Sequence, residues 1–179
     1  PSDTEGLTFT ESIFGGSVPK NFHPAVQKGL EEAMKKGVLA GFPMIGLKAN
    51  LFDGSYHDVD SSEMAFKMAA SLAYKEGMKQ AEPTLLEPIG SLEVSIPDDN
   101  TGDIMGDLNK RRGRVLGMNP SEEAGMTVIL AEVPLREMAD FAMQLRQITQ
   151  GEGSFQLTPV RYEQLPANLM TEVIASASE

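Results

Sequence analysis

Cysteine is missing from the 179 residues of this sequence, and histidine occurs only twice. The absence of cysteine excludes disulfide bonds, zinc sites built on thiolates and cysteine nucleophiles. No run approaches the 18 consecutive apolar residues that a membrane-spanning helix needs, and the first residues do not show the basic and then apolar pattern of a signal peptide. These absences fit a cytoplasmic protein without a membrane anchor.

Basic residues are scarce as well, since 15 lysines and arginines face 26 acidic residues, for a net charge of −11. Taken as a sum, this charge argues against nucleic-acid binding, because phosphate contacts need a basic surface. Basic residues do cluster locally, at Lys35-Lys36 and in the segment 110–114. On charge pattern alone, each cluster is typical of a solvated face or a helix end. The length suits one medium domain or two small ones.

The first half of the sequence predicts an α-β-α arrangement after an irregular start. Apolar spacing indicates a helix over 24–36, and alternation indicates a strand over 45–51. A second helix is expected to run to Ala81, with a row of apolar side chains in the core: Met64, Met68 and Leu72. Asp60 and Glu63 have the spacing of a capping box, which predicts Asp60 as the cap of this helix.

The second half predicts a β-α-β-β-α-β order, which is the ferredoxin-like split motif. Two prolines within 81–88 indicate a linker before it. The motif is followed by a short terminal helix over 168–176. The expected strands cover 91–97, 114–118, 125–134 and 153–165, and the expected helices cover 101–110 and a segment from Pro134 to Gly151. The fold class predicted is therefore α+β, with two small domains joined near Pro83.

The segment 53–63, "DGSYHDVDSSE", is the densest group of reactive side chains. A hydrolytic triad is disfavoured because its members usually come from distant parts of a chain. Metal binding by Asp53, His57, Asp58 and Asp60 is disfavoured because the spacing does not match a calcium loop. No G-x-x-x-x-G-K-[ST] motif is present. A solvated turn followed by a helix cap is the plain alternative.

Four long phrases nevertheless resemble the C-terminal region of bacterial elongation factor G and its close paralogues. They are "GGSVPKNFHPAVQKGLEEAMKKGVLAGFP", "DGSYHDVDSSEMAFKMAAS", "LLEPIGSLEVSIPDDNTGDIMGDLNKRRGRVLGM" and "AEVPLREMADFAMQLRQITQGEGSF". The resemblance implies that residues 1–83 are the fourth domain, an α/β sandwich with a left-handed βαβ crossover that lacks its first strand here. It implies that residues 84–179 are the fifth, ferredoxin-like domain.

The resemblance also implies a role in ribosomal translocation. GTP and Mg²⁺ would bind in an N-terminal domain, so this chain has no catalytic residue, metal or cofactor of its own. Its partners would be the ribosome, at the small-subunit decoding region and the large-subunit factor-binding region, together with transfer RNA and messenger RNA, and it would act as a monomer. The contact residues implied are a tip loop with His57, Tyr56, Ser55, Gly54 and Asp58, a second tip loop with Gly15, Gly16 and Lys20, and a basic group of Lys110, Arg111, Arg112 and Arg114.

Alternatives to the translocation role remain at this point. Glu152, in "TQGEGSF", departs from the basic or small residue of the common factor, and the charge of −11 is high. Both favour a paralogue that acts in ribosome recycling, or in ribosome protection. A stand-alone interaction module is a further alternative. The basic group 110–114 could equally pair with carboxylates of its own domain instead of RNA.

Overall fold

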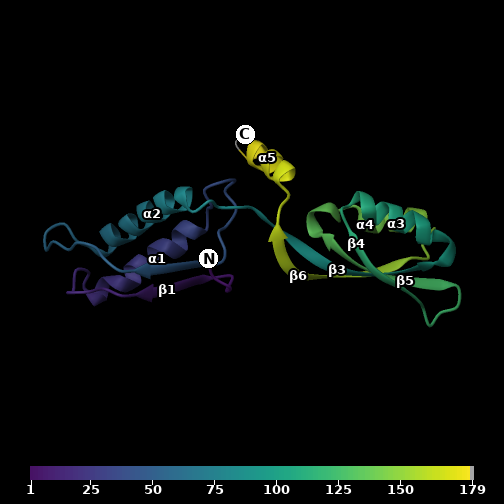
Figure 1. Cartoon of the computed structure of the whole chain (residues 1–179), viewed down its shortest axis with the longest axis horizontal. Helices are drawn as coiled ribbons and strands as arrows, with labels where there is room; N and C mark the ends of the chain where they lie inside the picture. The colour runs from purple at the N-terminus through teal and green to yellow at the C-terminus, as the bar shows by residue number, and fades with distance from the viewer. Residues whose placement is uncertain (178–179) are drawn as a thin grey trace. The chain divides into compact units, whose positions relative to one another are not determined.

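The computed structural model describes residues 1–177, which form two compact units (Figure 1). One unit contains residues 1–84 together with the segment that begins at Ala167, and the other contains Leu85–Pro166. Each unit combines helices with its own small sheet, so the predicted α+β class with two small domains is confirmed. Within residues 1–177, no helix has the length and apolar character needed to cross a membrane.

The first unit has a parallel two-stranded sheet. Strands β1 (Leu7–Glu11) and β2 (Leu47–Leu51) pair along their whole length, with Phe9 opposite Ala49. The chain between them forms a short 3-10 turn, η1 (Lys20–Phe22), and helix α1 (His23–Met34). Helix α2 (Glu63–Gln80) follows β2, and α5 (Ala167–Ser176) groups with this unit. The alternating burial of β2 follows the predicted pattern, whereas the left-handed crossover stays a prediction.

Helices α1 and α2 pack closely on each other. At Gly29 of α1 the helices are so near that an added Cβ would lie 2.7 Å from the backbone oxygen of Lys67 in α2. The buried face of α2 consists of Phe66, Ala70 and Tyr74. Phe66 and Ala70 join a core cluster with three residues that come from before and within α1: Val18, Ala25 and Val26.

The predicted core role of the Met64–Met68–Leu72 row is wrong. These side chains are 63%, 60% and 65% exposed, because the row lies on a different side of α2 from the face that packs on α1. Helix α2 has apolar residues on more than one side, so its sequence period does not single out the buried face.

The second unit is an antiparallel four-stranded sheet with two helices on one face (Figure 1). The strand order is β4-β5-β3-β6, and the elements follow the order β-α-β-β-α-β, so the ferredoxin-like prediction is confirmed. The elements are β3 (Leu86–Pro97), α3 (Thr101–Lys110), β4 (Arg114–Pro120), β5 (Met126–Pro134), α4 (Phe141–Ile148) and β6 (Ser154–Gln164), with 3-10 turns η2 (Asp98–Asn100) and η3 (Leu135–Glu137).

The core of this unit lies between the sheet and its helices. Alternate residues of β3 and β5 point inward, and they meet the buried faces of α3 and α4. The apolar side chains of this core with no more than 2% exposure are Leu92, Val94, Ile96, Ile104, Leu108, Ile129, Ala131, Val133, Phe141 and Leu145. Over 91–97 the buried residues of β3 alternate with more exposed ones, which is the pattern that the sequence predicts for this segment.

The predicted linker over 81–88 is only partly correct, because β3 already begins at Leu86. Pro88 lies inside this strand, where it pairs with Tyr162 of β6. The pairing of β3 with β5 begins one residue later, at Ile89. Pro88 therefore needs no backbone N–H on the β5 side, which is how a central strand accommodates a proline at this position.

Candidate nucleic-acid interface

Two loops meet at one end of the first unit. Because β1 and β2 are parallel, the loop that follows each strand leaves the same end of the sheet (Figure 1). The two loops are joined at their bases, where the Ser12 N–H donates to the Leu51 carbonyl at 2.8 Å and the Asn50 side-chain amide donates to Ser12 Oγ at 2.9 Å. The fold thus brings together the two segments that the family resemblance implies as tip loops, residues 15–20 and 53–60.

The loop after β2 is braced from behind by contacts with residues near the start of α1. A Cβ at Gly54 would lie 2.5 Å from Val18 Cγ2, so Gly54 packs directly on this buried valine. The Tyr56 ring lies 5.7 Å from the Phe22 ring, which in turn stacks on Phe66 of α2 at 4.6 Å. Aromatic contacts at these spacings each add about 0.5–1.5 kcal/mol beyond simple burial. The loop is therefore tied to the core cluster of its unit.

His57 occupies the turn of this loop. Its backbone N–H donates to Ser61 Oγ at 2.9 Å, and its carbonyl accepts hydrogen bonds from the N–H groups of Asp60, at 3.2 Å, and Ser61, at 2.9 Å. The backbone of His57 is thus closed into a tight turn, while the residue itself is exposed. Within the described residues, no hydrogen bond engages the imidazole. Both ring nitrogens are available to an external partner.

Tyr56 and Asp58, on either side of His57, interact with each other. A hydrogen bond from the Tyr56 hydroxyl to Asp58, together with the negative charge of that carboxylate, raises the pKa of Tyr56. Asp53 Oδ1 accepts a hydrogen bond from the N–H of the next residue, Gly54, at 2.8 Å. In the part of the chain that the structure describes, no three histidine or acidic side chains converge as a metal site would need. The polar groups of the loop therefore shape its turns.

The predicted cap of α2 is wrong. Helix α2 begins at Glu63, and its N-cap is Ser62, whose Oγ accepts a hydrogen bond from the Ala65 N–H at 3.1 Å. Asp60 lies in the preceding turn, so the pair of Asp60 and Glu63 does not form the capping box that their spacing predicts. The capping signal that sequence reasoning missed is the serine directly before the first helical residue.

Replacing Ser62 with alanine tests this cap. We expect Ser62→Ala to lower the free energy of unfolding of the first unit by about 1 kcal/mol, because the Ala65 N–H loses its partner. The matched control is Asp60→Ala, which is expected to leave this free energy unchanged. Urea unfolding followed by NMR signals of α2 measures both. A loss in Asp60→Ala with none in Ser62→Ala would contradict the assignment.

The loop after β1 is held by its own set of contacts. Gly15 and Gly16 have φ values of +68° and +71°, a backbone region that favours glycine. His23 Nε2 lies 3.1 Å from the Val18 carbonyl oxygen, which fixes the end of the loop against α1. Lys20 begins the turn η1 and is exposed. The predicted residues Gly15, Gly16 and Lys20 thus lie in a loop that packs beside His57's loop through Val18.

Three of the four basic residues in 110–114 form ion pairs inside the second unit. Arg111 is buried and bonds to Asp107 at 2.7 Å and to Asp140 at 2.6 Å, and these carboxylates raise its pKa against the opposing effect of burial. Lys110 is exposed and has no ion pair among the described residues. Of the two roles that the sequence leaves open for Arg111, the geometry favours pairing within the domain.

Arg112 and Arg114 are engaged in the same way. Arg112 forms a bidentate pair with the buried Glu87, at 2.9 and 2.7 Å. Arg114 forms an ion pair with Glu132 across the β4–β5 pair. Arg161 of β6 also binds Glu132 at 2.7 Å, and hydrogen bonds from these two guanidinium groups, Arg161's first, lower the pKa of Glu132 to about 2. Sequence spacing gave no signal for these pairs, since the partners lie 18 to 29 residues apart.

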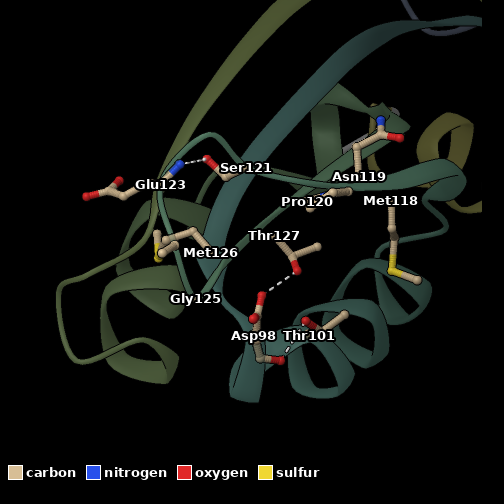
Figure 2. A pocket seen from close by; sticks show the side chains of 11 residues that line it. Asp98, Thr101, Met118, Asn119, Pro120, Ser121, Glu123, Gly125, Met126 and Thr127 are labelled. Atoms are coloured by element: carbon tan, nitrogen blue, oxygen red, sulfur yellow. Dashed lines mark hydrogen bonds between the residues drawn. The ribbon is translucent and has the colours of Figure 1, made fainter.

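A hollow of about 460 Å³ lies between the β4–β5 hairpin and the start of α3 (Figure 2). Its polar side chains bind one another: Thr127 Oγ1 donates to Asp98 Oδ1 at 2.6 Å, and Thr101 Oγ1 donates to the Asp98 carbonyl at 2.8 Å. Among the described residues that line it, none is lysine or arginine. Without a basic group, this hollow is unsuited to a phosphate-bearing ligand.

Comparison with known proteins assigns both halves of the chain. Residues 1–82 match the sequence model of elongation factor G, domain IV, and residues 84–173 match that of the elongation factor G C-terminus. The chain is 51% identical over 170 residues to an elongation factor G-like protein of Thermotoga maritima. That match covers 95% of this chain and 25% of the relative.

A crystal structure of a protein from Thermus thermophilus has the same fold, with a TM-score of 0.90 and 43% identity over 99% of this chain and 26% of that one. The chain thus spans about a quarter of the length of these relatives. Together the two family-model matches cover nearly all of the sequence. The chain belongs to the elongation factor G family.

Proposed function

We propose that this chain is the ribosome-contacting C-terminal part of a translational GTPase that promotes translocation during protein synthesis. Membership of the elongation factor G family supports the general role. The observation that carries the finer proposal is His57, whose backbone is locked in a braced turn while its imidazole is free of partners within the described residues. GTP and Mg²⁺ would act in another part of the intact protein, in the cytoplasm.

The first unit would act as a mechanical contact. An imidazole can stack on a base or exchange hydrogen bonds with the 2′-hydroxyl groups and edges of an RNA duplex, without chemical reaction. The contacts of Gly54 with Val18, and of Tyr56 with Phe22, would make the loop rigid, so that it resists deformation when a force acts on it. Motion of the unit would therefore pass to a transfer RNA–messenger RNA duplex in the decoding region of the small subunit.

The second unit would face the factor-binding region of the large subunit. Of its predicted contact residues, Lys110 has an ammonium group that no ion pair engages in the part of the chain described, so it is the best candidate for an RNA phosphate. Arg111, Arg112 and Arg114 are committed to carboxylates and would mainly hold the local backbone in shape. We expect the intact protein to act as a monomer.

The test is a translocation assay with the intact protein and programmed ribosomes. We expect GTP-dependent movement of messenger RNA, and a translocation rate at least about tenfold lower for His57→Ala, because the tip loses its polar contact. His57→Gln keeps a donor and an acceptor and is expected to recover part of the rate. Rapid-mixing fluorescence of labelled messenger RNA measures the rate.

Ribosome recycling is the second candidate. It is favoured by Glu152, which stands where the common factor has a basic or small residue, and by the net charge of −11. The two candidates differ in their products: a translocase advances messenger RNA by one codon, whereas a recycling factor splits post-termination ribosomes into subunits. Light scattering of post-termination complexes, run beside the translocation assay, separates them.

A further inference from the structure

Phe14 is an aromatic residue on the surface of the first unit. Its side chain is 93% exposed, although a phenylalanine gains most of its stabilisation from burial. It lies in the loop after β1, directly before Gly15 and Gly16, at the end of the unit that also carries His57's loop. Phe52, directly after β2, is 71% exposed at the same end.

The structure holds Phe14 outward. Ile13, the residue before it, packs against the core cluster, and Val18, four residues after it, is 2% exposed. Both ends of the short segment 13–18 are therefore anchored in the core. The φ values of Gly15 and Gly16, +68° and +71°, turn the chain back within this distance. An aromatic ring presented from a loop anchored in this way needs little further ordering to bind a partner.

The charge around Phe14 restricts the kind of partner. Residues 11–20 and 52–63 contain one lysine, Lys20, and five carboxylates, Glu11, Asp53, Asp58, Asp60 and Glu63. Such a surface repels phosphate groups, so a favourable contact with RNA at this end has to be made with bases or sugars. Stacking of a base on an aromatic ring is the contact that does not depend on phosphate attraction, and it tolerates any base.

We propose that Phe14 is a stacking platform for an unpaired RNA base beside the duplex that His57's loop contacts. The occupant is single-stranded RNA, read through the face of a base and not through its sequence. Phe52 follows the neighbouring strand and is exposed at the same end of the sheet. This inference rests on the proposed function, and it adds a binding residue and its chemistry to the tip.

The test uses NMR of the 179-residue chain with the single-stranded RNA hexamer A6. We expect upfield ring-current shifts of adenine protons, with changes in the Phe14 ring signals that persist between about 50 and 200 mM salt. Phe14→Tyr should bind as well as the wild type, because it keeps the aromatic face. Phe14→Leu keeps the apolar character but loses the ring, and should weaken binding at least about fivefold.

The matched control is Phe42→Leu. Phe42 is 56% exposed in the loop before β2, at the opposite end of this strand from Phe52, and its replacement should leave RNA binding unchanged. The proposal is overturned if Phe14→Leu binds A6 like the wild type, if the shifts map away from Phe14, if they vanish at the higher salt concentration, or if A6 causes no shift at all.

The outcome is separable from that of the translocation assay. Stacking on Phe14 with a full translocation rate for His57→Ala would remove the proposed function and leave Phe14 as an RNA contact. A slow His57→Ala protein with no ring-current shift from A6 would leave the translocation role and remove the platform.

Discussion

Arg112→Ala is expected to lower the free energy of unfolding of the second unit by about 3 kcal/mol. Glu87, at the start of β3, is only 5% exposed, and both of its carboxylate oxygens accept hydrogen bonds from Arg112, at 2.9 and 2.7 Å. Removing the guanidinium leaves a buried negative charge without its main partner, which is one of the costliest single changes in a folded domain. Urea unfolding followed by NMR signals of β3 measures the effect.

A double-mutant cycle separates the pair from the loss of either side chain. Glu87→Gln removes the buried charge, so Arg112→Ala should cost clearly less when it is introduced into Glu87→Gln. The matched control is Lys110→Ala, because Lys110 lies two residues before Arg112 and its side chain is exposed. This substitution should leave the free energy of unfolding unchanged. Equal costs of Arg112→Ala in both backgrounds would mean that the pair does not stabilise the unit, and Arg112 would again be a candidate for RNA contact.

Gly29→Ala is expected to destabilise the first unit by about 1–3 kcal/mol. The added methyl group would lie 2.7 Å from the Lys67 carbonyl oxygen and 2.9 Å from the Lys67 Cα, both of which are backbone atoms that a rotamer change cannot move. The two helices would have to separate, and the support of the tip loop through Phe66 would be disturbed. Thermal unfolding followed by NMR signals of α1 and α2 measures the loss.

Gly77→Ala is the matched control, because Gly77 lies in α2 with open space around its Cβ position. It should stabilise the helix by about 0.5–1 kcal/mol, since alanine loses less backbone freedom than glycine on folding. A stabilising effect of both substitutions would show that α1 and α2 are not in close contact at Gly29.

The second unit is predictable from its sequence because its local signals agree with one another. The alternation in 91–97 and the apolar spacing in 101–110 each select one structure, and the resulting βαββαβ order is confirmed. In α2 the signals conflict. Both the row 64, 68, 72 and the row 66, 70, 74 have helical spacing, and only the contact with α1 decides that the second row is buried. Tertiary packing, not local pattern, sets this choice.

The candidate site is predictable only in part, for a similar reason. The residue types of the loop 53–60 draw attention to it, but its bracing by Val18 and Phe22 depends on a sheet register that links residues about 40 apart. The predicted cap is misplaced by two residues because aspartate and serine both suit an N-cap. The backbone N–H of Asp60 closes the turn at His57, and Ser62 is the residue that caps the helix. The distant partners, Asp140 of Arg111 and Glu87 of Arg112, could not be foreseen from a local run of basic residues.

Contact between the loop of His57 and the moving duplex is tested by the translocation rate of the intact His57→Ala protein beside that of Lys79→Ala. Lys79 is exposed and lies near the C-terminal end of α2. The residue of α2 that supports the loop of His57, Phe66, lies near the other end of this helix. We expect a large loss of rate for His57→Ala, an unchanged rate for Lys79→Ala and equal melting temperatures for both. A His57→Ala protein that translocates at the full rate would contradict the claim that this loop contacts the moving duplex.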